Sequence, residues 1–331
     1  MKLFLILMGL FFHGIVRSET IEIAFVGDVN LTSRIDDAIQ KYGTGWPFEN
    51  IKKDLSRADY RVANLESPAG MGGEKYCDKR VYFKTDPTSL DALKDADFNL
   101  VSLANNHALD YGPDILRQTE KELKNRGIDS VGVVSSISED STFVIKEIRG
   151  VRFGFLAYCS VCPKEFAPAI NKLGISTGDP DRVIREIKKL KLLVDFVIVL
   201  PHWGGEYQAV DINQRSFAKR ALKAGADVIV GAHPHVLQKI EQKQDGKIIA
   251  YSLGNFVFPM RWEVSMDSAI LFVEFQKNPR KISYRYVPIE LNTNRPKEAT
   301  SAGRQLRVLL LLSDGLDFSS DRKWREDELA N

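Results

Sequence analysis

The sequence is poor in cysteine, which excludes a disulfide framework as its main source of stability. Its 331 residues include three cysteines, Cys77, Cys159 and Cys162, and small disulfide-built domains need more. Cys159 and Cys162 have the CxxC spacing of redox and zinc sites, but no second CxxC pair exists to complete a zinc site. We therefore expect either a local disulfide or two buried thiols at this pair.

The sequence also lacks an excess of charge of either sign. It has 46 Lys and Arg residues against 44 Asp and Glu residues, whereas a nucleic-acid-binding domain has a basic excess. We therefore expect no nucleic-acid partner. Hydrophobic residues make up 44% of the chain, which is enough for a large folded core.

Long hydrophobic runs are missing as well. The apolar run at residues 3–12 spans about ten residues, and a transmembrane helix needs about 20. Lys2 precedes this run, and Val16 and Ser18 follow it with the spacing of a cleavage site. We therefore expect residues 1–18 to be a signal peptide or an uncleaved anchor, and the protein to be exported to the periplasm or the cell exterior.

No repeat or low-complexity linker divides the chain, and strand and helix patterns alternate along it. We expect strands at 21–26, 61–65, 98–103, 128–134, 143–148, 151–158, 196–200 and 227–230, and helices at 90–95, 114–126, 181–193 and 214–224. From residue 236 onward the pattern predicts strands, at 236–241, 247–252, 269–275 and 282–289. This order predicts an α/β fold of two packed sheets with helices outside. One domain over residues 20–290 would precede a polar extension, residues 291–331, with one helix.

Five of the apolar segments end in polar clusters. These clusters contain Asp28; Asn64 and Glu66; Asn105, Asn106 and His107; His202; and His233 and His235. Ligands of open α/β sheets bind beyond the carboxyl ends of the strands, so we expect these side chains to converge. Histidine is scarce, with five in the chain, and four of the five lie in these clusters. Carboxylate, amide and imidazole groups together favour a site for divalent transition metals.

The clusters belong to longer motifs: GDVNL at 27–31, NLESP at 64–68, ANNHALDYG at 104–112, HWGGEY at 202–207, GAHPHV at 231–236 and YSLGNFVF at 251–258. In this order they resemble the bacterial capsule-synthesis CapA/PgsA family of poly-gamma-glutamate biosynthesis. That family is similar to calcineurin-like metallophosphoesterases. The resemblance implies a four-layer α/β/β/α sandwich and a centre of one or two divalent ions, Mn, Fe or Zn.

The resemblance also implies roles for individual residues. The implied metal ligands are Asp28, Glu66, Asn106, His202, His233 and His235. His107 would be the catalytic acid, and Asp110 would orient it or remain a solvated acid. The expected substrate contacts are Asn30, Lys84, Glu206, Tyr207 and Asn255. The broader superfamily has a histidine where this chain has Asn30, and an aspartate where it has Glu66.

Three functions fit these residues. The first is a metal-dependent hydrolase of a phosphoester or of an amide-linked envelope polymer. The second is a non-catalytic component for capsule assembly, export or anchoring, with membrane-bound capsule-synthesis proteins as partners. The third is a module that keeps the metal-site geometry to bind an anionic polymer. The family name favours the second function. His107 favours the first, because a scaffold needs no proton donor.

Overall fold

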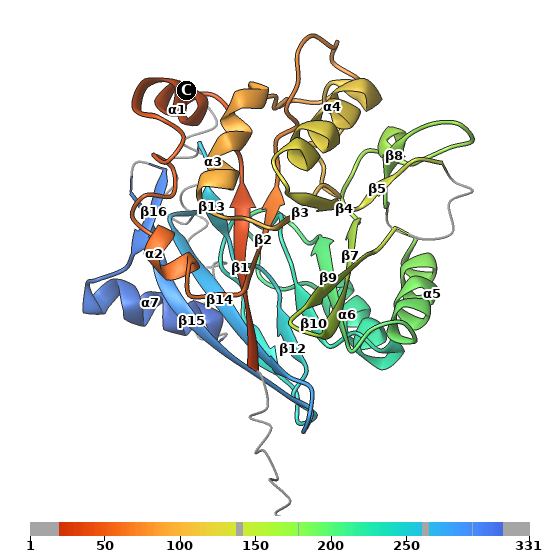
Figure 1. Cartoon of the computed structure of the whole chain (residues 1–331), viewed down its shortest axis with the longest axis vertical. Helices are drawn as coiled ribbons and strands as arrows, with labels where there is room; N and C mark the ends of the chain where they lie inside the picture. The colour runs from red at the N-terminus through yellow and green to blue at the C-terminus, as the bar shows by residue number, and fades with distance from the viewer. Residues whose placement is uncertain (1–19, 137–141, 178, 260–264, 293, 314–331) are drawn as a thin grey trace, which may run out of the picture.

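Two β-sheets form the centre of the fold, and helices cover the outer face of each (Figure 1). The computed structural model describes residues 20–136, 142–177, 179–259, 265–292 and 294–313. The predicted signal peptide at residues 1–18 lies outside these residues. Within the described ranges, no helix combines the length and the apolar character needed to cross a membrane.

The first sheet has the strand order β16-β15-β14-β1-β2-β3-β4, with β13 also paired to β1. Strands β1 to β4 run parallel, and β14 to β16 add an antiparallel half. The strands are β1 (Thr20–Val29), β2 (Tyr60–Leu65), β3 (Leu100–Ser102), β4 (Asp129–Val131), β13 (Asn255–Val257), β14 (Asp267–Gln276), β15 (Lys281–Asn292) and β16 (Arg295–Glu298). Its outer face packs against α1 (Arg34–Tyr42), α2 (Lys52–Leu55), η1 (Pro87–Leu90), α3 (Asp91–Asp95) and α4 (Gly112–Asn125).

The second sheet has the order β11-β12-β10-β9-β7-β6. Its strands are β6 (Val144–Ile148), β7 (Val151–Cys159), β9 (Phe196–His202), β10 (Val228–Val230), β11 (Ile240–Gln242) and β12 (Ile248–Ala250). Helices α5 (Pro180–Lys191) and α6 (Ile212–Ala224) cover its outer face. Strands β5 (Val133–Val134) and β8 (Gly174–Ile175) form a separate pair, and η2 (Lys164–Phe166) lies between β7 and β8.

The main core lies between the two sheets. Alternate residues of β1, such as Ile23 and Phe25, face Phe155 and Ile198 of the second sheet in one buried cluster. The residue between them, Ala24, belongs to the cluster under the first helical layer. This alternation is what a strand with both faces covered requires. The predicted four-layer α/β/β/α sandwich is confirmed.

The chain beyond residue 290 belongs to the same folded unit. Strand β16 pairs with β15, and α7 (Ala302–Leu312) buries Val308, Leu311 and Leu312 in the core between the sheets. Arg304 and Arg307 of α7 bind the fully buried Asp267 at 2.8 and 2.6 Å. The domain therefore continues past the predicted boundary at residue 290 to the end of α7.

The cysteine pair forms the local disulfide that the spacing allowed. Cys159 ends β7 and is bonded to Cys162, while Cys77 is a free thiol. In the register of the second sheet, Cys159 lies beside His202 of β9. The disulfide therefore fixes the chain next to one of the predicted metal ligands.

Candidate metal centre

The polar clusters meet at one edge, where parallel strands of both sheets end. Asp28 lies near the end of β1, and Glu66 directly follows β2. His202 is the last residue of β9, while His233 and His235 follow β10. All five side chains are at least nine-tenths buried. The centre therefore takes ligands from both sheets and lies at the junction between them.

A first group of ligand atoms comes from Asp28, Glu66 and His235, and these atoms lie within 4.8 Å of one another. The Nδ1 atom of His235 is 3.2 Å from Asp28 Oδ2, and its Nε2 atom is 3.7 Å from Glu66 Oε1. Asn255 Oδ1 is 2.9 Å from the same Nδ1. This group has the size and the oxygen and nitrogen atoms that a divalent transition metal needs.

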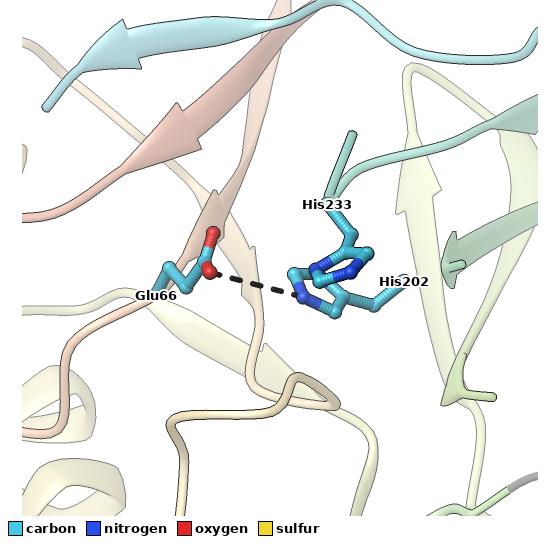
Figure 2. Close-up of side chains that lie close together, drawn as sticks. All are labelled: Glu66, His202 and His233. Carbon is cyan, nitrogen blue, oxygen red and sulfur yellow. Dashed lines mark ion pairs between the residues drawn. The ribbon is translucent and has the colours of Figure 1, made fainter. Parts of the chain in front are cut away.

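A second group shares Glu66 with the first and adds His202 and His233 (Figure 2). Glu66 Oε1 is 3.8 Å from His202 Nε2, and the centres of the His202 and His233 rings are 4.8 Å apart. Asn106 Oδ1 approaches the same His202 Nε2 at 2.9 Å. Glu66 is thus common to both ligand groups.

The unpaired polar atoms of the cluster indicate that it fits a cation. Among the described residues, both carboxylate oxygens of Glu66 and the Nδ1 atom of His233 are buried without a hydrogen-bond partner. Buried polar groups are normally paired, and a buried charge needs compensation. Glu66 also lies close enough to Asp28 for the negative charge of Asp28 to raise its pKa. A divalent ion would supply the missing partner to Glu66 and His233.

The ionisation of the cluster follows from burial and from its two acids. Burial, and then the charge of Asp28, raise the pKa of Glu66 well above its usual value. Burial lowers the pKa of His202 well below its usual value and that of His233 to about 3. Burial opposes the charge on His235, but Glu66 and Asp28 outweigh it and raise its pKa to about 9. Without an ion, His202 and His233 are therefore neutral, whereas His235 carries a proton.

His107 lies beside the two groups and points one nitrogen at them. Its Nε2 atom is 4.0 Å from Glu66 Oε1, and its Nδ1 atom is 2.6 Å from Asp110 Oδ2. Asp110 is fully buried and also accepts a 2.7 Å hydrogen bond from the backbone N–H of Phe83. Burial lowers the pKa of His107, although Asp110 opposes this shift. Asp110 thus fixes the ring so that Nε2 faces the cluster.

Lys79 is the cation next to this pair, and no motif of the sequence indicated it. Its ammonium group binds Asp110 Oδ1 and the backbone carbonyl of Asn106. The predicted cation, Lys84, instead binds the carbonyl of Gly72 and lies 4.2 Å from the centre of the Tyr111 ring. In the part of the chain that the structure describes, no contact joins Lys84 to the ligand groups.

The other predicted substrate residues lie around the cluster in different ways. Glu206 forms a third possible ligand group with His233 and His235, and the Tyr207 ring lies 6.0 Å from that of His235. The side-chain oxygen of Asn30 accepts hydrogen bonds from the backbone and the hydroxyl of Thr32, at 3.0 and 2.6 Å. That oxygen is therefore already engaged and does not replace the histidine found there in the broader superfamily.

Two asparagines brace the centre. Asn64 donates a 2.8 Å hydrogen bond to Asp28 Oδ1. Asn105 donates to the carbonyl of Leu65 at 2.8 Å and accepts from the backbone N–H of His107 at 3.1 Å. Such partners orient the side chains that bind a metal. Both asparagines lie in the polar clusters that the sequence singled out, but nothing in their spacing distinguishes a brace from a ligand.

Residues 22–260 match the family described as "Bacterial capsule synthesis protein PGA_cap". The chain belongs to this family. It is 32% identical to the "Capsule biosynthesis protein CapA" of Bacillus anthracis, over 95% of this chain and 78% of that protein. It is 34% identical to the "PGA biosynthesis protein CapA" of Bacillus subtilis (strain 168), over 84% and 73%. The family interpretation of the motifs is confirmed.

Solved structures place this PGA_cap chain in the metallophosphoesterase-like fold. One is a phosphatase from Mycoplasma pneumoniae, with a TM-score of 0.53 and 14% identity, over 85% of this chain and 95% of that one. Another is a 5'-nucleotidase precursor from Thermus thermophilus, with a TM-score of 0.51 and 14% identity, over 88% and 58%. At such low identity the likeness shows the fold alone.

Proposed function

We propose that this PGA_cap-family protein is a metal-dependent hydrolase of phosphoester or amide bonds that works in capsule synthesis outside the cytoplasm. The observation that carries the proposal is the pairing of two ligand groups on Glu66 with a buried His107–Asp110 pair beside them. A site that binds metal without chemistry needs no oriented imidazole next to it. Export rests on the apolar run at residues 3–12 and its flanking residues.

The ligands would divide between two ions. Asp28, Glu66 and His235 would hold one, and Glu66, His202, His233 and Asn106 the other. The mixture of oxygen and imidazole ligands suits Mn, Fe or Zn. When bound, such ions act as Lewis acids, activating water and stabilising negative charge on the substrate.

The residues of the chain supply orientation and the proton. His107 Nε2 faces Glu66, so a proton on this atom is directed at whatever bond lies over the two ligand groups. Asp110 accepts from Nδ1 and keeps the ring in that orientation. Lys79 holds Asp110 and the Asn106 carbonyl together, which links the proton donor to a metal ligand. His107 is therefore the proposed general acid for the leaving group.

The substrate class comes from the relatives. The Bacillus subtilis relative is named for PGA biosynthesis and the Bacillus anthracis relative for capsule biosynthesis. We assign to this chain an anionic capsule polymer such as poly-gamma-glutamate, or a phosphoester of the cell envelope. Its partners would be membrane-bound capsule-synthesis proteins. The same names support a second candidate function, a non-catalytic component for assembly, export or anchoring of the polymer.

A metal analysis combined with a turnover assay separates the two functions. Protein purified without chelator is analysed for bound metal, then loaded with Mn²⁺, Fe²⁺ or Zn²⁺ and offered phosphodiesters, phosphomonoesters and γ-glutamyl peptides. Turnover of any of these supports the hydrolase. Fully loaded protein that turns over none of them supports the assembly component.

The variant His107→Ala tests the proposed acid. We expect kcat to fall about 100- to 10,000-fold, the usual contribution of a general acid, while metal content stays near that of the unaltered protein. The readouts are single-substrate kinetics and elemental analysis of the same samples. Loss of metal together with activity would instead make His107 a ligand.

A further inference from the structure

A basic groove lies on the outer surface of the second sheet, between α6 and the β11–β12 hairpin. It has a volume of about 740 Å³. Five cationic side chains line it, against two acidic ones: Arg215, Lys219, Lys223, Lys243 and Lys247, with Glu241 and Asp245. None of these charged residues belongs to the metal centre or to the motifs found in the sequence, although Tyr251 of the motif at 251–258 also lines the groove. The groove is therefore a separate feature that the proposed hydrolase does not use.

The cations of α6 form a row. Arg215, Lys219 and Lys223 are exposed and stand four residues apart, so they share one helix face with steps of about 6 Å. Among the described residues, neither Lys219 nor Lys223 has an acidic partner within 4 Å. Lys219 and Lys223 therefore offer positive charge that the described part of the protein leaves uncompensated.

The two acids of the lining do not cancel this charge. Glu241 is already paired with Lys239 at 2.7 Å and with Lys243, and it lies 3.8 Å from Arg215. Asp245 pairs with Lys247 at 2.8 Å. The field of the groove is therefore set by the remaining cations, and a concave basic surface concentrates anions.

The groove begins at the edge of the sheet that carries the metal centre. Helix α6 follows the carboxyl end of β9, so its first cation, Arg215, lies at that edge, about 6 Å from the centre of the Tyr251 ring. The Tyr251 carbonyl accepts a 2.8 Å hydrogen bond from the indole of Trp203, which directly follows His202. The row of cations thus starts behind a metal ligand and runs away from the centre along α6.

We propose that this groove binds an extended polycarboxylate chain and holds it beside the metal centre. Carboxylates repeated along a chain can pair with the cations repeated along α6. A groove can also enclose a chain, whereas a flat membrane surface cannot enter it. Four of the five cations are lysines, which bind as flexible point charges, so the row matches the spacing of charges along a chain and not the planar geometry of any one group. The proposal deepens the proposed function, because the polymer would be held next to the site where we place hydrolysis.

A binding experiment on the full, metal-loaded protein tests the groove. The probe is fluorescently labelled poly-gamma-glutamate of defined length, with dextran as the uncharged comparison. We expect the double variant Lys219→Glu/Lys223→Glu to bind the probe about tenfold more weakly or worse, with a smaller dependence on salt. The matched control is Lys188→Glu/Lys189→Glu, which places the same charges on exposed positions of the neighbouring helix α5. We expect this control to bind within about twofold of the unaltered protein.

Three outcomes overturn the proposal. Unchanged probe binding by the α6 variant would exclude the groove as the binding site. An equal loss of affinity in the α6 variant and the α5 control would show that binding responds to net charge alone. Inorganic polyphosphate or phosphatidylglycerol vesicles that displace the probe through the same lysines, with higher affinity, make the ligand a phosphate and not a carboxylate chain. The hydrolase is judged separately, from turnover of small substrates by the unaltered protein. Absent turnover with α6-dependent binding would leave the groove standing.

Discussion

Glu66 is the residue on which the candidate centre depends most. Its Oε1 atom lies 3.7 to 4.0 Å from nitrogens of His235, His202 and His107. The Glu66 carboxylate is fully buried and has no hydrogen-bond partner among the described residues. No hydrogen bond therefore explains why an acid is buried at this position. Its position indicates a charge held in place for a cation.

Replacing Glu66 by glutamine keeps the size of the side chain and removes the charge. We expect Glu66→Gln to lower metal affinity about 10- to 100-fold or more, because both ligand groups lose their shared carboxylate. Elemental analysis after dialysis against a weak chelator measures the loss. The control is Glu49→Gln, a surface acid that pairs with Arg295. Full metal content in Glu66→Gln would remove Glu66 from the centre.

The raised pKa of His235 predicts that metal binding depends on pH. Burial lowers this pKa, but Glu66 and Asp28 outweigh burial and raise it to about 9, so His235 holds a proton in the ion-free protein at neutral pH. An ion must displace this proton, so its apparent affinity rises with pH below about 9, roughly tenfold per unit. Calorimetry in buffers of different ionisation enthalpy counts the protons. Affinity independent of pH between 6 and 8 would contradict this assignment.

At the scale of the elements, the close contact of β1 with the turn before β13 fixes Asp28. The N–H of Asp28 donates to the carbonyl of Gly254 at 3.0 Å, and Asp28 lies opposite Asn255 in the parallel register. A methyl group on Gly27 would lie 1.9 Å from that carbonyl oxygen. Glycine at this position is therefore required for two backbones to approach beside the centre.

The variant Gly27→Ala should separate these two segments. We expect a loss of about 3 kcal/mol or more in the free energy of unfolding, together with lower metal content, because Asp28 moves with β1. Gly45→Ala is the matched control, since no atom lies within 4 Å of its added methyl group. Thermal unfolding and elemental analysis of both variants decide the outcome. Equal free energies of unfolding for the two variants would show that β1 accommodates the added methyl group without loss of stability.

The elements that position the ligands were largely predictable, because their signals are local. The apolar segment before His202 ends in a polar residue, and parallel strands bring such ends together whatever the intervening sequence. Helix α1 was not predicted; it spans only nine residues, and Ser33 before it makes no side-chain cap. The strand predicted at 236–241 is shorter, since β11 starts at Ile240.

Lys79 shows what the sequence could not predict. It lies in a segment without regular structure, and its ammonium group binds Asp110 and lies 5.5 Å from the ring of Phe166 in η2. Such a contact between distant segments leaves no periodic pattern in the sequence. Lys84 is five positions further along the same segment, and its role as a substrate contact stays a prediction.

At the scale of the whole molecule, α7 ties the C-terminal part of the described chain to the sandwich through one buried acid. Asp267 has no exposed surface and is held by Arg304 and Arg307, whose side chains are 24% and 32% exposed. Removing the partners of a buried charge is costly. The helix therefore stabilises the antiparallel half of the first sheet as well as the core.

Replacing both arginines by methionine leaves Asp267 buried and unpaired. We expect Arg304→Met/Arg307→Met to lose about 3–5 kcal/mol of unfolding free energy, measured by urea denaturation. Adding Asp267→Asn removes the buried charge and should recover part of the loss. If the triple variant is no more stable than the double, the loss comes from the arginine stems and not from the unpaired acid.

The ligands of the centre come from both sheets and from distant points of the chain, with Asp28 and His233 separated by 205 positions. A polypeptide still emerging from the ribosome or from a translocation channel cannot bring them together until the chain through His235 is present. Metal loading must therefore accompany or follow folding. The ions that the centre acquires are then those of the compartment in which folding is completed, whatever the metal supply at the place of synthesis.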